Sequence, residues 1–152
     1  MTKKLAALVC GATFAFSAVC SATVAPEKIS VGGITPGMTP EQVIAAIGEP
    51  LAKNQMQDEW FYKEFELDFA APKGSNEYVE QIKSRTAGVK TGAGFTVGDK
   101  EDVVEKALGK PDKKYSKKNV ETLFLYYSND KKQVLSVRVN DGVITKITSE
   151  FK

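Results

Sequence analysis

Histidine is absent from the 152-residue chain, and the only two cysteines, Cys10 and Cys20, lie close to its N-terminus. Histidine is the usual general base at neutral pH, and cysteine is the most nucleophilic of the common side chains. The sequence also lacks a phosphate loop ending in Gly-Lys-Ser or Gly-Lys-Thr. These absences argue against triad, thiol and nucleotide chemistry, so we predict a protein that is not an enzyme and has no cofactor or metal site.

A charge excess of either sign is also missing. The formal net charge of +2 includes Lys3 and Lys4, and the rest of the chain holds 19 basic and 19 acidic side chains. Residues 26–85 carry 6 basic and 10 acidic side chains, whereas residues 86–152 carry 13 and 9. Overall neutrality argues against nucleic acid as a partner. The opposite charges of the two halves would either attract one another or polarise a surface for a partner.

One apolar run exists, from Leu5 to Val19, and it follows Lys3 and Lys4. At about 15 residues it is shorter than the roughly 20 needed for a membrane span, and small residues follow it. We therefore interpret residues 1–22 as a signal peptide cut after Ala22, with a cut after Ala25 as the alternative. The protein would be exported, either periplasmic or secreted. Cys20 leaves a second interpretation open, a lipoprotein anchored to the membrane through this residue.

A short phrase occurs twice. Residues 33–50 read GITPGMTPEQVIAAIGEP, and 61 positions later residues 94–111 read GFTVGDKEDVVEKALGKP. Internal repetition of this kind predicts a tandem arrangement. We divide the chain into a first unit at 26–84, a Gly-rich joint at 85–94 and a second unit at 95–152, with residues 26–33 expected to be irregular.

Each phrase predicts a short helix. Thr39 and Gln42 form a capping box around Pro40, and in the second copy Asp99 would have to serve as the cap. Gly48 and Gly109 would end the helices in a left-handed conformation.

Alternating apolar residues then predict strands at 59–63, 65–69, 78–83, 122–128, 134–139 and 143–149. We therefore expect an α+β fold. Two helix-plus-antiparallel-meander units of about three strands each would form one domain, with the short helices on one face of the sheet.

The first copy resembles a known family. The residues Gly37-Met38-Thr39-Pro40-Glu41-Gln42-Val43, then Ile47-Gly48-Glu49-Pro50, then Trp60-Phe61-Tyr62 resemble the SmpA/OmlA (BamE-like) envelope domain family. The tandem arrangement is similar to that of beta-lactamase inhibitory proteins. The resemblance implies a non-catalytic protein that binds a protein partner in the envelope or extracellular space. Inhibition of a secreted or periplasmic enzyme is one alternative, and binding of a small ligand or divalent ion is another.

Two sets of residues are candidates for partner binding. Trp and Tyr are favoured at interfaces, and aromatic residues line both sides of two predicted strands. They would form either a recognition patch or a face buried on both sides. The lysine-rich segment 110–118 is expected to be a loop that either only solubilises the protein or contacts an acidic partner or an anionic membrane surface. The candidates are Trp60, Tyr62, Phe124, Tyr126, Lys113, Lys114, Lys117 and Lys118.

A row of carboxylates is a candidate for a divalent-ion site. Glu64, Glu66 and Asp68 alternate along one predicted strand and would share one face. Such a row is typical of a solvated sheet surface, and a divalent-ion site is the alternative.

Overall fold

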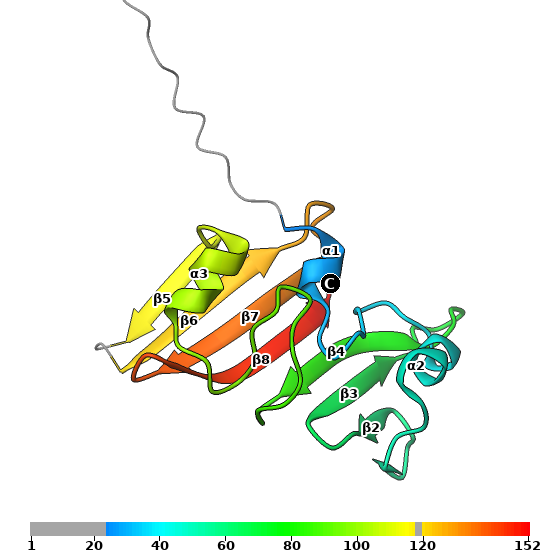
Figure 1. Ribbon diagram of the computed structural model, residues 1–152. Helices are drawn as coiled ribbons and strands as arrows, with labels where there is room; N and C mark the ends of the chain where they lie inside the picture. Colours follow the sequence, from blue (N-terminus) through cyan, green and yellow to red (C-terminus); the bar gives the residue numbers. More distant parts are fainter. Residues whose placement is uncertain (1–23, 118–119) are drawn as a thin grey trace, which may run out of the picture.

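The computed structural model describes residues 24–117 and 120–152, whose ribbon is coloured in Figure 1. The predicted signal peptide 1–22, with Cys20, and the candidate Lys118 lie outside the described residues. The described ranges contain three short helices, α1 (Pro26–Ile29), α2 (Pro40–Ile47) and α3 (Asp102–Leu108).

Eight strands form one antiparallel sheet in the order β1-β2-β3-β4-β8-β7-β6-β5. The α+β prediction is therefore confirmed. In each half a helix is followed by four strands rather than the expected three, and the halves join where β4 pairs with β8. The strands are β1 (Ala52–Lys53), β2 (Glu59–Phe61), β3 (Phe65–Ala70), β4 (Tyr78–Ser84), β5 (Lys113–Lys117), β6 (Glu121–Tyr127), β7 (Gln133–Asn140) and β8 (Val143–Phe151).

Three elements differ from the sequence prediction. Residues 26–29 form α1 although this stretch was expected to be irregular, and β1 is a two-residue strand that no alternation could show. The lysine-rich segment was expected to be a loop, and this was wrong, because Lys113–Lys117 form β5 at one edge of the sheet. Lysine has a low preference for strands, but pairing with β6 decides the conformation here, and charged residues suit an exposed edge.

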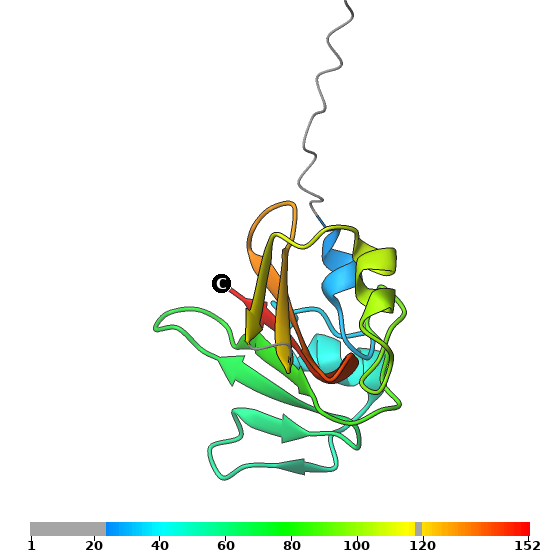
Figure 2. The same ribbon diagram turned by 90° about the vertical axis from the view of Figure 1, so that its left-hand side faces the viewer.

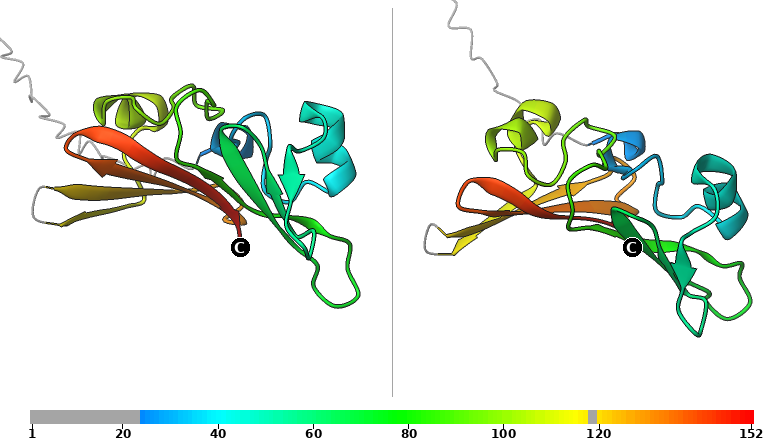
Figure 3. Two further views of the ribbon diagram at one scale, coloured as in Figure 1. Left: turned by 90° about the horizontal axis from the view of Figure 1, so that it is seen from below. Right: turned by 60° about the horizontal axis from the view of Figure 1, so that its bottom comes forward.

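The core lies between the sheet and the helices. Figures 2 and 3 show all three helices on the same side of the sheet. Phe65, Leu67 and Phe69 point into this core from β3, as their alternation predicted, while Val43 and Val104 reach it from α2 and α3. The opposite face of the sheet has no helix over it among the described residues, and we call it the open face.

The repeated phrase fastens each helix to the last strand of its own half. Just before α2, the Gly37 amide donates to the Val79 carbonyl of β4, and the Val79 amide donates back to Met38. Just before α3, the Gly98 amide donates to the Ile144 carbonyl of β8, and the Ile144 amide donates back to Asp99. The four N···O distances are 2.8–2.9 Å. The glycine before each helix, Gly37 or Gly98, therefore bonds the loop to the sheet, in addition to the glycine that ends the helix.

The two helices begin differently. In α2 the Thr39 and Gln42 side chains form the predicted capping box. In α3 the prediction that Asp99 is the cap was wrong: Glu101 occupies the cap position without a side-chain hydrogen bond. Asp99 instead accepts a hydrogen bond from the Thr96 amide, at 2.9 Å. Because Asp99 is held in the preceding turn, it is not available to the helix.

The two helices end alike. Gly48 and Gly109 follow them with φ of 82° and 77°, positive as predicted, but with ψ of −175° and −161°. This extended region with positive φ is open almost only to glycine, and it turns the chain away from the helix more sharply than the left-handed cap that we expected.

Candidate partner-binding face

Strand register determines what the open face presents. Across the second half, directly paired residues form three rows, which begin at Tyr115, at Lys113 and at Tyr127. Because paired residues of neighbouring strands share a face, each row can be read from the register. The rows are Tyr115-Leu123-Arg138-Lys146, Lys113-Leu125-Ser136-Thr148 and Tyr127-Val134-Glu150. The last two rows continue into the first half through Lys83 and Gln81 of β4.

The aromatic candidates occupy the other side of the sheet. Trp60, Phe124 and Tyr126 are buried members of the helix-side core, and Tyr62 is half-buried against it. Of the two alternatives left open for them, an exposed patch or burial, the structure shows burial, because alternation shows that a strand has two faces but does not show which one the helices cover. Trp60 Nε1 donates to the Gln57 carbonyl at 2.9 Å, so its polar atom is satisfied inside the protein.

Tyr62 and Tyr126 have equivalent structural tasks. Tyr62 Oη donates to the Gly48 carbonyl at 2.9 Å, and Tyr126 Oη donates to the Gly109 carbonyl at 3.0 Å. Each tyrosine thus satisfies the carbonyl of the glycine that ends a helix. Burial, together with the charges of Glu105 and Asp112, raises the pKa of Tyr126 well above its usual range.

Partly exposed apolar side chains gather on the open face of the second half. Leu123, Leu125 and Tyr127 of β6 are half-buried there, and Tyr115 of β5 is 55% exposed. Val134 lies beneath this group; it is buried, yet it is not part of the core cluster on the helix side. We call Leu123, Leu125, Tyr127 and Tyr115 the apolar strip. No other element covers this strip among the described residues.

The lysine candidates divide between the two faces of β5. Lys113 and Lys117 pair with Leu125 and Glu121, so they lie on the open face beside the apolar strip. Lys114 turns to the helix side, where its Nζ lies 3.5 Å and 3.3 Å from carboxylate oxygens of Glu101 and Glu105. Lys114 therefore serves to join β5 to α3, and only the other two border the apolar strip.

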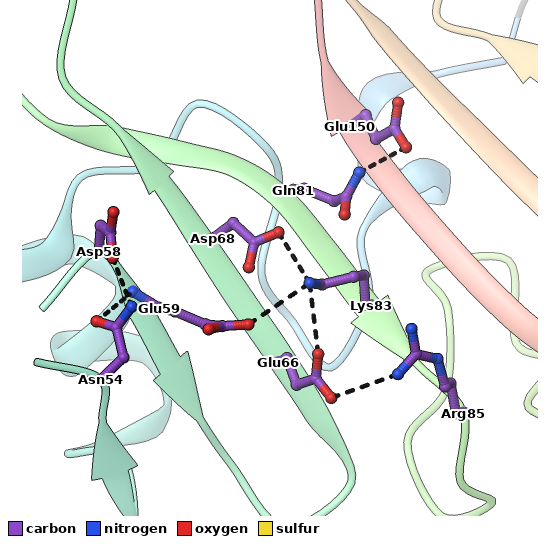
Figure 4. Close-up of polar contacts among 9 residues, drawn as sticks. All are labelled: Asn54, Asp58, Glu59, Glu66, Asp68, Gln81, Lys83, Arg85 and Glu150. Atoms are coloured by element: carbon purple, nitrogen blue, oxygen red, sulfur yellow. Dashed lines mark hydrogen bonds and ion pairs between the residues drawn. The ribbon is translucent and has the colours of Figure 1, made fainter. Parts of the chain in front are cut away.

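The open face of the first half is charged (Figure 4). Lys83 Nζ lies 3.7, 3.4 and 3.0 Å from carboxylate oxygens of Glu59, Glu66 and Asp68. Burial favours the neutral form of Lys83, but the hydrogen bonds and charges of Asp68 and Glu66 outweigh it and raise the pKa of Lys83 above its usual value. A second cation, Arg85, approaches Glu66 at 3.8 Å. The ammonium group of Lys83 thus contacts two of the carboxylates that suggested an ion site, those of Glu66 and Asp68.

The row of acidic residues differs from the prediction in one position. Glu66 and Asp68 lie on the open face of β3, whereas Glu64 precedes the strand and pairs with Lys63 at 3.6 Å. Within residues 24–117 and 120–152, no group of three His, Cys, Asp or Glu side chains is arranged to hold a metal ion. None of the helices in these ranges has the length and apolar character that crossing a membrane requires.

Sequence reasoning missed the residues that the open face brings together. Leu123, Leu125 and Tyr127 alternate with Phe124 and Tyr126, but we chose the other set. Arg138, Lys146 and Thr148 are far from the lysine-rich segment in sequence, and only the register of β5 to β8 places them on the same face of the sheet as Lys113. The signal that could have found them is the alternation of polar residues along β7 and β8.

Comparisons with known proteins bear on the first half. A crystal structure of a DUF4309 family protein (YjgB) from Bacillus subtilis subsp. subtilis str. 168 is 18% identical, with a TM-score of 0.46; the match covers 75% of this chain and 78% of that one. The search of curated proteins gave no match. Residues 24–64 match the family model of the outer membrane protein assembly factor BamE domain. The resemblance predicted from the Gly37–Tyr62 motifs is therefore confirmed: residues 24–64 are similar to the BamE domain family.

Proposed function

We propose that this chain is an exported, non-catalytic module of the cell envelope that binds a protein partner through the open face of its second half. The observation that carries the proposal is the apolar strip, over which no helix lies among the described residues and which Lys113 and Lys117 border. The ammonium groups of Lys113 and Lys152 lie 5.9 and 3.9 Å from the centroid of the Tyr127 ring. The match to an assembly factor domain supports a role in protein–protein contact.

The composition of this face suits recognition of a protein. Tyrosine and leucine side chains that are only half-covered can bury further area, and the surrounding lysines form a polar rim. The cations near the strip favour a partner whose contact surface is acidic, since opposite potentials speed association and select against other partners. In contrast, the carboxylates of the first half are already occupied by Lys83 and Arg85.

A pull-down from an envelope extract tests the proposal. Leu125→Ser and Tyr127→Ala remove apolar area from the strip, and we expect each variant to lose most of the partner that the unmodified protein captures. Phe61→Ser is the matched control, because Phe61 is a half-buried residue of the open face in the other half. Equal capture by all three variants would refute the proposed face.

Export and anchoring are tested separately by the mass of the mature N-terminus. We propose cleavage after Ala22, so the mature chain should begin at Thr23. An acylated Cys20 would show the lipoprotein alternative instead. Inhibition of an enzyme and binding of a small ligand or divalent ion stay predictions, since no feature of the described residues favours either one.

We also infer that the two halves are tandem copies of one unit. The paired hydrogen bonds before α2 and α3 support this, as do the two tyrosine–glycine contacts. Segments 30–32 and 90–92 also contact each other reciprocally: Gly32 donates to Lys90 and Gly92 donates to Ser30, at 2.9 and 2.8 Å. The donors lie 60 residues apart in sequence, and so do the acceptors.

A further inference from the structure

Two cations stand directly opposite each other on the open face. Arg138 of β7 pairs in register with Lys146 of β8. Like charges at directly opposed positions of an antiparallel pair destabilise the sheet. The cross-strand neighbour of Arg138 on β6 is Leu123, which offers no charge in return. Only one carboxylate, that of Glu121 at 3.9 Å from Arg138, offsets the pair in the described ranges, so part of the repulsion is left uncompensated.

A hollow of about 140 Å³ lies at this pair. Two hydroxyl-bearing residues, Ser136 and Thr148, face each other across β7 and β8 one row further along. Thr148 is only 5% exposed, yet neither its hydroxyl nor that of Ser136 has a hydrogen-bond partner within the described part of the chain. The hollow is lined by Leu123, Ser136, Arg138, Lys146, Thr148 and Glu150.

The neighbouring charges leave Lys146 with a positive environment. Burial lowers the pKa of Lys146, and so do the charges of Arg85, Arg138 and Lys83, while Glu150 acts in the opposite sense. In the described ranges no ion pair joins Lys146 to a carboxylate.

Two acids lie near the pair. Glu150, which lines the hollow, accepts a hydrogen bond from Gln81 Nε2 at 2.7 Å, and Glu121 Oε1 lies 3.9 Å from Arg138 Nε. Arg138 therefore has one long contact with a carboxylate, at the outer limit of an ion pair.

We propose that this hollow, formed by Arg138, Lys146, Ser136 and Thr148, binds one carboxylate group of the protein partner, from an aspartate or glutamate side chain. The assignment of this carboxylate to a protein partner rests on the proposed function. The binding of a carboxylate by the hollow is independent of it. The guanidinium of Arg138 offers parallel N–H groups that match a carboxylate, and Lys146 and the free hydroxyls supply further donors.

The charge of the lining selects a monoanion. Arg138, Lys146 and Glu150 together carry a net charge of +1 at neutral pH, so one carboxylate neutralises the hollow. A phosphate group carries up to two negative charges and would meet Glu150 with an excess of charge. Lys83 adds little, because three carboxylates already surround it.

A titration of the ¹⁵N-labelled mature protein tests the site without any partner. Sodium acetate replaces sodium chloride at constant ionic strength, and the amide signals of residues 136–148 are followed. We expect saturable shifts, confined to this region. Binding should weaken at least about tenfold in the Arg138→Gln/Lys146→Met double variant, consistent with the loss of charge-assisted hydrogen bonds. Thr148→Val should weaken it about twofold to tenfold through loss of one hydroxyl donor.

Lys73→Met is the matched control, since Lys73 is exposed in the loop between β3 and β4. Thermal melts show that each variant is folded, and Lys146→Met should melt about 1–3 °C higher because the like-charge pair is gone. Linear shifts without saturation, or shifts that are equal in the double variant and the control, would overturn the site. Tighter binding of inorganic phosphate than of acetate would overturn the carboxylate assignment. Partner capture is measured separately, so a failed pull-down with a saturable acetate titration would refute only the proposed function.

Discussion

Lys83→Met is the substitution whose effect can be worked out most fully from the structure. Methionine keeps the length and apolar stem of lysine but leaves three carboxylates, those of Glu59, Glu66 and Asp68, without the ammonium that lies 3.0–3.7 Å from them. Only Arg85, 3.8 Å from Glu66, would still offset their charge. The variant therefore loses three attractions and exposes a repulsion among like charges.

The burial of these groups sets the magnitude. An exposed ion pair contributes about 0–1 kcal/mol, whereas breaking a fully buried one costs about 3–5 kcal/mol. The Lys83 side chain is 16% exposed and its three partners are 29–35% exposed, so this network lies between these limits. We expect Lys83→Met to lower the free energy of unfolding by about 2 kcal/mol, and the melting temperature by about 7 °C.

The pH dependence distinguishes this explanation from a simple packing defect. Because the pKa of Lys83 is raised in the folded protein, its contribution is fully present below the pKa of lysine in the unfolded chain and is lost as pH rises through the folded value. The unmodified protein thus keeps the contribution at pH 7. The variant has no ammonium group at this position, so it lacks this contribution at pH 7 and has none to lose as the pH rises. The difference in melting temperature should therefore narrow as the pH is raised from 7 to 11.

Differential scanning calorimetry at both pH values measures the effect. Lys63→Met is the matched control: its side chain is 83% exposed and pairs with one carboxylate, that of Glu64, so the free energy should change by less than about 0.5 kcal/mol. The reasoning fails if Lys83→Met melts at the same temperature as the unmodified protein, or if its melting temperature is lowered equally at pH 7 and pH 11.

Four further substitutions test the contacts that end and begin the helices. Tyr126→Phe should cost about 1–2 kcal/mol in chemical denaturation, because the Gly109 carbonyl loses its partner, and Tyr62→Phe should cost less because Tyr62 is more exposed. Gly109→Ala should cost about 1–3 kcal/mol in the same assay, since φ of 77° with ψ of −161° strains any residue with a Cβ; an unchanged midpoint would contradict the assigned conformation. Thr39→Ala should cost about 0.5–2 kcal/mol through loss of the capping box, with helix content followed by circular dichroism.

The features that the sequence predicted well are those set by residues close together in the chain. The capping box of Thr39 and Gln42 needs only a spacing of three residues, and the alternation of Phe65, Leu67 and Phe69 needs only a period of two. The stop at Gly48 and Pro50 is equally local. For such features neighbouring side chains supply most of the determining interactions, so one sequence suffices.

The features that it predicted poorly depend on strands that are distant in the chain. The lysine-rich segment becomes β5 because β6 pairs with it, and its own composition opposes the assignment. Trp60 and Tyr126 were offered as binding residues because nothing in the sequence states which face of their strands the helices cover. Likewise, Arg138 and Lys146 become neighbours only through the register of β7 with β8.

The seam between β4 and β8 has a consequence for assembly. In this seam Ile82 pairs with Ser149, and Ser84 pairs with Ile147. The two isoleucines are 65 residues apart in sequence, and the two serines are also 65 residues apart. If the halves are copies of one unit, a two-fold axis passes between the paired residues Lys83 and Thr148 that separate them. A single unit would then carry a self-complementary edge, and two separate copies could pair along it as a homodimer. If so, the present chain corresponds to two such units that are covalently joined, so that each side of the interface can change without altering the other.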